Sequence, residues 1–171
     1  RLLHEYAQKH GIVFTVETVP SRVVKGWYDD AARNDPDKIM NVYELPMEAI
    51  EATAQTGAWV ANDFGHTAAI PSDNAKELWQ YLQAKTVKLA PQTRLIHLGF
   101  LTPPFNGTDF HNILDNPLLD TSQAVPNKKQ MRELLQLFKG RDDIWILTEP
   151  NGRHVENYFL AQKILAESLQ N

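Results

Sequence analysis

The sequence predicts an α/β fold built on a parallel β-sheet. Two observations lead to this prediction. Four short apolar runs alternate along the chain with amphipathic segments, which is the pattern of alternating strands and helices. The runs are nearly continuously apolar, as in strands that are buried on both faces of a parallel sheet. The 171 residues fit one domain by length, so we expect residues 1–171 to form a single domain.

Each expected strand follows a turn-forming residue or a polar segment. Gly11 precedes the first run and Gly57 the second, while Pro91 precedes the third and an Arg-Asp-Asp segment the fourth. The expected strands are residues 12–16 (IVFTV), 58–61 (AWVA), 94–98 (RLIHL) and 144–147 (IWIL).

Capping residues mark the helices expected between these strands. Pro46 is suited to a first helical position, and Ser72 and Asn127 are suited to be N-caps before apolar residues at helical spacing. Two long connections, residues 18–45 and 99–126, follow the first and third strands. Connections of this length in a compact domain usually carry function.

The composition is that of an ordinary globular protein and excludes some functions. The hydrophobic fraction is 43% and the charged fraction 22%, and no stretch approaches 18 apolar residues, so we expect a cytoplasmic protein without a membrane span. The net charge of −4 argues against a wide nucleic-acid surface, because phosphate neutralisation needs clustered Lys and Arg. Cysteine is absent, so any metal site must use His, Asp and Glu.

The N-terminus shows no signal-peptide pattern. The chain begins at Arg1 rather than at Met, in a segment with the pattern of a helix interior. We therefore expect a fragment or a processed piece of a longer polypeptide, with removal of the start Met alone as the alternative.

Potential metal ligands stand at or near the C-terminal ends of all four expected strands. Glu17 ends the first and Asp63 the second, His97 lies late in the third, and Glu149 follows the fourth; His66 comes three residues after Asp63. Ligands bind at the C-terminal ends of the strands in parallel α/β folds. Carboxylates and imidazoles suit Mn²⁺, Mg²⁺ or Zn²⁺, and a carboxylate that is not a ligand could move a proton. We therefore predict a shared site for a divalent metal.

Each of these residues also has an ordinary structural explanation when it is considered alone. A single Glu at a strand end is more often a solvated loop residue, and a single His in an apolar strand is more often a satisfied core residue. The segment from Asp63 to His66 has the composition of a simple turn, in which Asp63 accepts backbone N–H bonds. The prediction depends on finding four such residues at equivalent positions.

The same segments resemble the xylose-isomerase-like TIM barrels. This family includes sugar isomerases and epimerases and the endonuclease-IV-type abasic-site endonucleases. The matching segments are residues 11–17 (GIVFTVE), 60–66 (VANDFGH), 96–98 (IHL) and 146–150 (ILTEP). The resemblance covers about residues 11–165 and corresponds to strands five to eight of the (β/α)8 barrel. It therefore implies that the chain is the C-terminal half of a TIM barrel.

The resemblance implies a metal-dependent isomerase or epimerase that acts on a sugar or sugar derivative. Glu17, Asp63, His97 and Glu149 would bind a divalent ion (Mn, Mg or Zn), and Glu17 and Glu149 would be the catalytic residues that transfer a proton at carbon. His66 would contact the substrate or a second metal ion.

Two alternative functions remain open. In the endonuclease branch an Asp-x-His motif follows the ligand His, and Asp109 and His111 stand in a suitable place to bind a further zinc ion. Nucleic acid is the substrate only under this alternative, and the two residues are otherwise an ordinary loop pair. The third hypothesis is a barrel relative without catalytic activity.

A half barrel exposes two sheet edges and an inner face. We therefore expect this chain to associate with a missing N-terminal half or to form a homo-oligomer.

Overall fold

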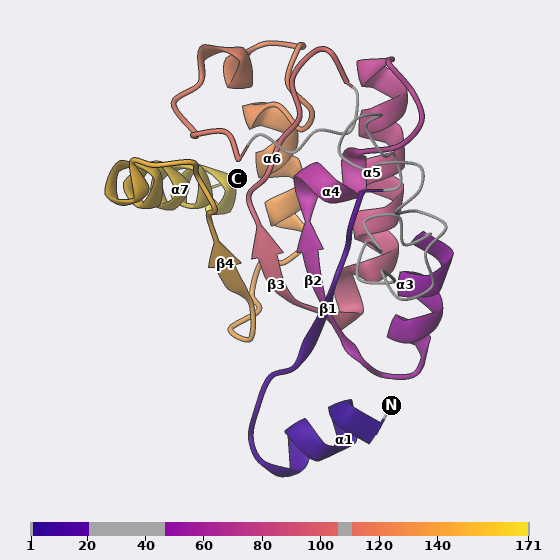
Figure 1. Ribbon diagram of the computed structural model, residues 1–171. Helices are drawn as coiled ribbons and strands as arrows, with labels where there is room; N and C mark the ends of the chain where they lie inside the picture. Colours follow the sequence, from indigo (N-terminus) through magenta and orange to yellow (C-terminus); the bar gives the residue numbers. More distant parts are fainter. Residues whose placement is uncertain (1, 21–46, 106–110, 171) are drawn as a thin grey trace.

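A four-stranded parallel sheet organises the fold. The computed structural model describes residues 2–20, 47–105 and 111–170. The strands are β1 (Thr15–Glu17), β2 (Trp59–Asp63), β3 (Thr93–His97) and β4 (Trp145–Leu147), and their order in the sheet is β1-β2-β3-β4 (Figure 1). Every neighbouring pair is parallel. The expected α/β fold with a parallel sheet is confirmed.

Helices occupy the segments between the strands and both ends of the described chain. They are α1 (Leu2–Lys9), α3 (Met47–Gln55), α4 (Phe64–Ala68), α5 (Ala75–Leu89), α6 (Lys128–Gln136) and α7 (His154–Leu169), with 3₁₀ turns η2 (Ala90–Gln92) and η3 (Pro117–Asp120). In Figure 1, α7 stands beside β4 at one edge of the sheet, and α1 lies below the starts of the strands. No helix among the described residues is both long enough and apolar enough to cross a bilayer.

The helices cover one face of the sheet. Val60 is fully buried in an apolar cluster with Ile50 of α3 and Leu89 of α5. Ile96 is fully buried in a larger cluster that includes Leu82 of α5 and Leu134 of α6. Successive side chains of a strand point to opposite faces, so the residues next to Val60 and Ile96 face away from the helices.

The expectation that all four strands are buried on both faces was wrong for β4. Ile146 packs against the larger core, but its neighbours Trp145 and Leu147 are 71% and 42% exposed. The first strand is also shorter than expected, because residues 12–14 are exposed and precede the ladder that starts at Thr15. Both strands lie at sheet edges, and among the described residues no second layer covers the face opposite the helices at β4.

Two of the expected helix starts can be compared with the structure. Asn127 is the N-cap of α6, and its side chain and that of Gln130 form a reciprocal capping box. Ser72 does not cap α5; the helix begins two residues later and is capped by Asn74, whose side chain accepts from the Lys76 N–H. Ser72 instead accepts from the Asn74 N–H and so supports the cap. Pro46 lies outside the described residues.

A buried carboxylate joins α3 to α5. Glu51 is buried. One of its carboxylate oxygens lies 2.7 Å from Lys85 Nζ and the other lies 2.6 Å from Lys88 Nζ. Burial alone would raise the pKa of Glu51, but the two ammonium groups outweigh this effect and lower it below its usual value. The carboxylate is therefore ionised and paired, and it holds α3 against α5 on the helix-covered face.

The Glu51→Ala variant is expected to lose about 1–3 kcal/mol of unfolding free energy, because Lys85 is left partly buried without its partner. Urea denaturation measures this loss. Glu133→Ala is the matched control: its carboxylate lies 3.9 Å from Lys129 Nζ on an exposed helix surface, and its removal should change stability by less than about 0.5 kcal/mol. Equal effects of the two substitutions would contradict the structural role of Glu51.

Candidate metal centre

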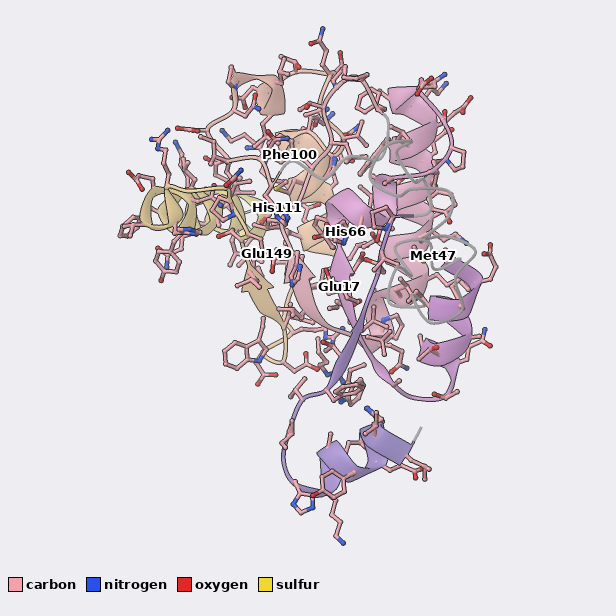
Figure 2. All side chains as sticks on the ribbon, viewed as in Figure 1. Glu17, Met47, His66, Phe100, His111 and Glu149 are labelled. Carbon is pink, nitrogen blue, oxygen red and sulfur yellow. The ribbon has the colours of Figure 1, made fainter. Side chains whose placement is uncertain are left out.

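The structure brings the four predicted ligands to one end of the sheet. Glu17, Asp63 and His97 are the last residues of β1, β2 and β3, and Glu149 follows the end of β4 by two residues. Asp63 and His97 are direct partners in the β2–β3 register. Figure 2 shows Glu17, His66, His111 and Glu149 around the C-terminal ends of the strands.

Three carboxylates surround one nitrogen of His97. His97 Nδ1 lies 3.3 Å from Glu17 Oε1, 3.4 Å from Asp63 Oδ2 and 3.6 Å from Glu149 Oε2. The side chains of Asp63 and His97 are 6% exposed, whereas those of Glu17 and Glu149 are 40% and 41% exposed. The two central candidate ligands are therefore buried, and two accessible carboxylates flank them from the opposite edges of the sheet.

This donor set fits a divalent cation. Within the described part of the chain, neither ring nitrogen of His97 has a hydrogen-bond partner, although both are buried. Asp63, His97 and Glu149 each offer one ligand atom, and these atoms all lie within 4.8 Å of one another. A pocket lined by Asp63, His97, Glu149 and neighbouring residues has about 20 Å³ of space, enough for one small occupant. Oxygen and imidazole donors suit Mn²⁺, Mg²⁺ or Zn²⁺.

The electrostatics of the site also favour a cation. Interactions with His66 and His97 lower the pKa of Glu17 to about 2, against the opposing effect of partial burial. Burial alone would lower the pKa of His97, but the carboxylates of Asp63 and Glu17 outweigh it and raise that pKa to about 10. A proton on His97 therefore balances part of the negative charge of the surrounding carboxylates.

Asp63 has two roles at the end of β2. Its Oδ1 accepts the His66 N–H at 3.0 Å and so caps the short helix α4, as the turn interpretation predicts. Its Oδ2 faces His97 at 3.4 Å. The structural and the ligand explanations of Asp63 are thus compatible, because they use different oxygens.

His66 lies on the Glu17 side of the site. Its Nδ1 is 3.0 Å from the Thr18 carbonyl oxygen, 3.4 Å from Glu17 Oε1 and 3.7 Å from Asp63 Oδ2. A carbonyl oxygen only accepts hydrogen bonds, so Nδ1 carries a proton and the lone pair of the neutral ring is on Nε2. His66 is therefore less suited than His97 to bind an ion through Nδ1.

Of the Asp109–His111 pair, the structure describes only His111. Asp109 lies outside the described residues. His111 lines the same pocket as Asp63, His97 and Glu149, with a left-handed backbone (φ 44°) and its carbonyl accepting from the Asn151 N–H at 2.8 Å. The described residues form two groups of three converging ligands, Glu17–Asp63–His66 and Asp63–His97–Glu149, and His111 belongs to neither.

The sequence did not single out Gly99, which the site requires for close packing. A Cβ atom at Gly99 would lie 2.6 Å from Asp63 Oδ1 and 3.1 Å from the Gly65 nitrogen. Only glycine leaves room for the Asp63 carboxylate in its capping position. The available signal in the sequence was a glycine two residues after the candidate ligand His97, where β3 has just ended.

The Gly99→Ala variant is expected to bind Mn²⁺ at least about tenfold more weakly than the wild type, because the added methyl group displaces the Asp63 carboxylate. Isothermal titration calorimetry measures the affinity, and a melting curve of the same sample reports the cost to the fold. Unchanged affinity would show that the close packing of Gly99 against the Asp63 carboxylate does not hold Asp63 in a metal-binding position.

Comparisons with known proteins identify no relative of this chain. No protein-family model, no curated protein and no solved structure matches it.

Proposed function

We propose that the protein is a metal-dependent isomerase or epimerase that acts on a sugar or sugar derivative. The observation that carries this proposal is the convergence of three carboxylates on His97 Nδ1 at 3.3–3.6 Å. Asp63 and His97 would bind the ion from within the protein, and Glu17 and Glu149 would complete its ligands from the two sides. A bound divalent ion would act as a Lewis acid toward the oxygens of the sugar.

The two accessible carboxylates suit proton transfer at carbon. Glu17 ends the edge strand β1, and Glu149 comes two residues after the other edge strand, β4. The two carboxylates therefore approach the site from opposite edges of the sheet. One carboxylate can remove a proton from the carbon beside the carbonyl, and the other, once protonated from solvent, can deliver that proton to the opposite face of the carbon. Glu17 is ionised in the metal-free protein, with its pKa lowered to about 2, so it needs no prior deprotonation, but a carboxylate with so low a pKa is a weak base.

The charge around the site favours a sugar over a phosphodiester. Among the described residues the pocket lining contains no Lys or Arg, and it includes the carboxylates of Asp63 and Glu149. Arg153, near Glu149 in the sequence, is paired with Asp115 at 2.5 Å. The zinc-dependent endonuclease is the second candidate, and the position of His111 in the same pocket favours it.

We also propose that the sheet is half of a (β/α)8 barrel. Its four parallel strands alternate with helices, the candidate ligands stand at their C-terminal ends, and the face that carries Trp145 and Leu147 is exposed. Another half barrel or a second copy would cover this face. Light scattering and acrylamide quenching of Trp145 fluorescence, with Trp145→Phe to assign the signal, test this arrangement. A monomer with fully quenchable Trp145 would contradict coverage by a second copy and would leave a separate half barrel as the partner.

The test of function is turnover by the Mn²⁺-loaded protein in D₂O with a panel of ketoses and aldoses. We expect an isomerised or epimerised sugar that carries deuterium at the reacting carbon. Glu149→Gln should reduce turnover by about 10²–10⁴-fold while Mn²⁺ remains measurable in the sample. Cleavage of abasic-site DNA without sugar turnover would favour the endonuclease. Metal binding with neither activity would favour the non-catalytic relative.

A further inference from the structure

Thr18 stands directly behind the candidate metal centre and is completely buried. It follows Glu17, beyond the last pair of the β1–β2 register, and its N–H donates to the Ala61 carbonyl at 2.9 Å. The site residues predicted from sequence do not include it. Thr18 therefore lies between the two candidate ligands Glu17, at the end of β1, and Asp63, at the end of β2.

The hydroxyl group of Thr18 joins the ends of these two strands. Its Oγ1 accepts the Asp63 N–H at 3.0 Å and lies 3.3 Å from the Asp63 carbonyl oxygen. The side chain thus bonds to the backbone of Asp63 where the regular ladder between the strands has ended. Since Glu17 and Asp63 are adjacent to these contacts, the hydroxyl restricts how far their carboxylates can separate.

A chain of buried polar groups keeps the hydroxyl in place. Thr67 Oγ1 of α4 lies 3.0 Å from Thr18 Oγ1 and 2.8 Å from Asn62 Oδ1. The Asn62 side chain in turn donates to Thr86 Oγ1 of α5 at 3.1 Å. All four side chains are at most 1% exposed. Polar groups at such depth are restricted to partners inside the protein, which makes this network rigid.

We propose that Thr18 is the positioning residue of the metal centre, holding Asp63 at the distance from Glu17 that lets both carboxylates bind one divalent ion. This inference rests on the proposed metal site. Groups that orient metal ligands commonly change metal affinity by about 10–100-fold when they are removed. The carbonyl oxygen of the same residue accepts from His66 Nδ1 at 3.0 Å, so Thr18 fixes a ring beside Glu17 as well as the backbone of Asp63.

The test compares three variants. Thr18→Val preserves the shape of the side chain and removes the hydroxyl, whereas Thr18→Ser retains it. Thr93→Val is the matched control, because Thr93 is equally buried and donates to the Leu89 carbonyl at 3.0 Å, but lies at the opposite end of the sheet. The measurements are the Kd for Mn²⁺ by calorimetry, the visible spectrum of the Co²⁺-loaded protein and the melting temperature of the metal-free protein.

We expect Thr18→Val to raise the Kd for Mn²⁺ by about tenfold or more and to change the Co²⁺ spectrum. Thr18→Ser should restore both, and Thr93→Val should lower the melting temperature while it leaves Kd and spectrum unchanged. If Thr18→Val does not fold, Thr18→Ala removes the same hydroxyl without placing a methyl group against the Asp63 N–H.

Two results would overturn the inference while the proposed function stands: wild-type Kd in the variants that lack the hydroxyl, or an equal loss of affinity in Thr93→Val. A wild-type protein that binds neither Mn²⁺ nor Co²⁺ would overturn the proposed function, and with it the role of Thr18. The two failures are therefore distinguishable in one set of titrations.

Discussion

The His97→Ala variant is expected to bind Mn²⁺ about 100-fold more weakly than the wild type, or not at all, while it keeps the wild-type circular dichroism spectrum. His97 supplies the nitrogen on which three carboxylates converge. Its protonated ring is paired with the carboxylates of Asp63 and Glu17, so its removal is also expected to lower the stability of the metal-free protein. The apolar core lies on the other face of the sheet, where Ile96 packs, and should be little affected.

Calorimetric titration with Mn²⁺, supported by metal analysis after dialysis, measures this effect. His154→Ala is the control, since His154 is an exposed imidazole at the start of α7, a few residues after Glu149. It should leave both affinity and stoichiometry unchanged. An unaltered metal stoichiometry in His97→Ala would refute the ligand role of His97.

Metal affinity is expected to rise about 100-fold between pH 6 and pH 8. The raised pKa of His97, about 10, means that the metal-free imidazole is protonated throughout this range. A metal ligand must be deprotonated, so each bound ion displaces one proton and the affinity gains about one order of magnitude per pH unit. Glu17, with its pKa lowered to about 2, is already ionised and adds no further slope.

Titrations in two buffers of different ionisation enthalpy count the released proton directly. The same pKa predicts how the metal-free protein behaves. The charged form of His97 stabilises the fold, so this contribution is complete below the ordinary pKa of about 6.5 and is lost as the pH rises through about 10. If the affinity did not depend on pH between 6 and 8, the metal ion would not be displacing a proton from His97. His97 would then not be a ligand.

The sequence pattern was sufficient to predict the strand–helix alternation and the sites of the candidate ligands. Continuous apolar runs identified all four strands, and the ligands stood directly at their ends, because position within a parallel strand determines which edge of the sheet a residue reaches. The capping box at Asn127 was equally accessible, since it depends on residues three positions apart.

Contacts between distant segments could not be predicted in this way. The hydroxyl of Thr18 meets Asp63 across 45 positions of the sequence, and Gly99 is required only because the Asp63 carboxylate lies against it. The exposure of Trp145 and Leu147 likewise depends on what covers the sheet, not on their apolar character.

The sequence by itself therefore determined the α/β class and the line of acidic and imidazole groups at the strand ends, because both follow from local periodicity. Only the tertiary structure decided that His97 lies among three carboxylates and that Thr18 joins the strands behind them. Those distances depend on strand register and on the packing of α4 and α5, which no local pattern encodes.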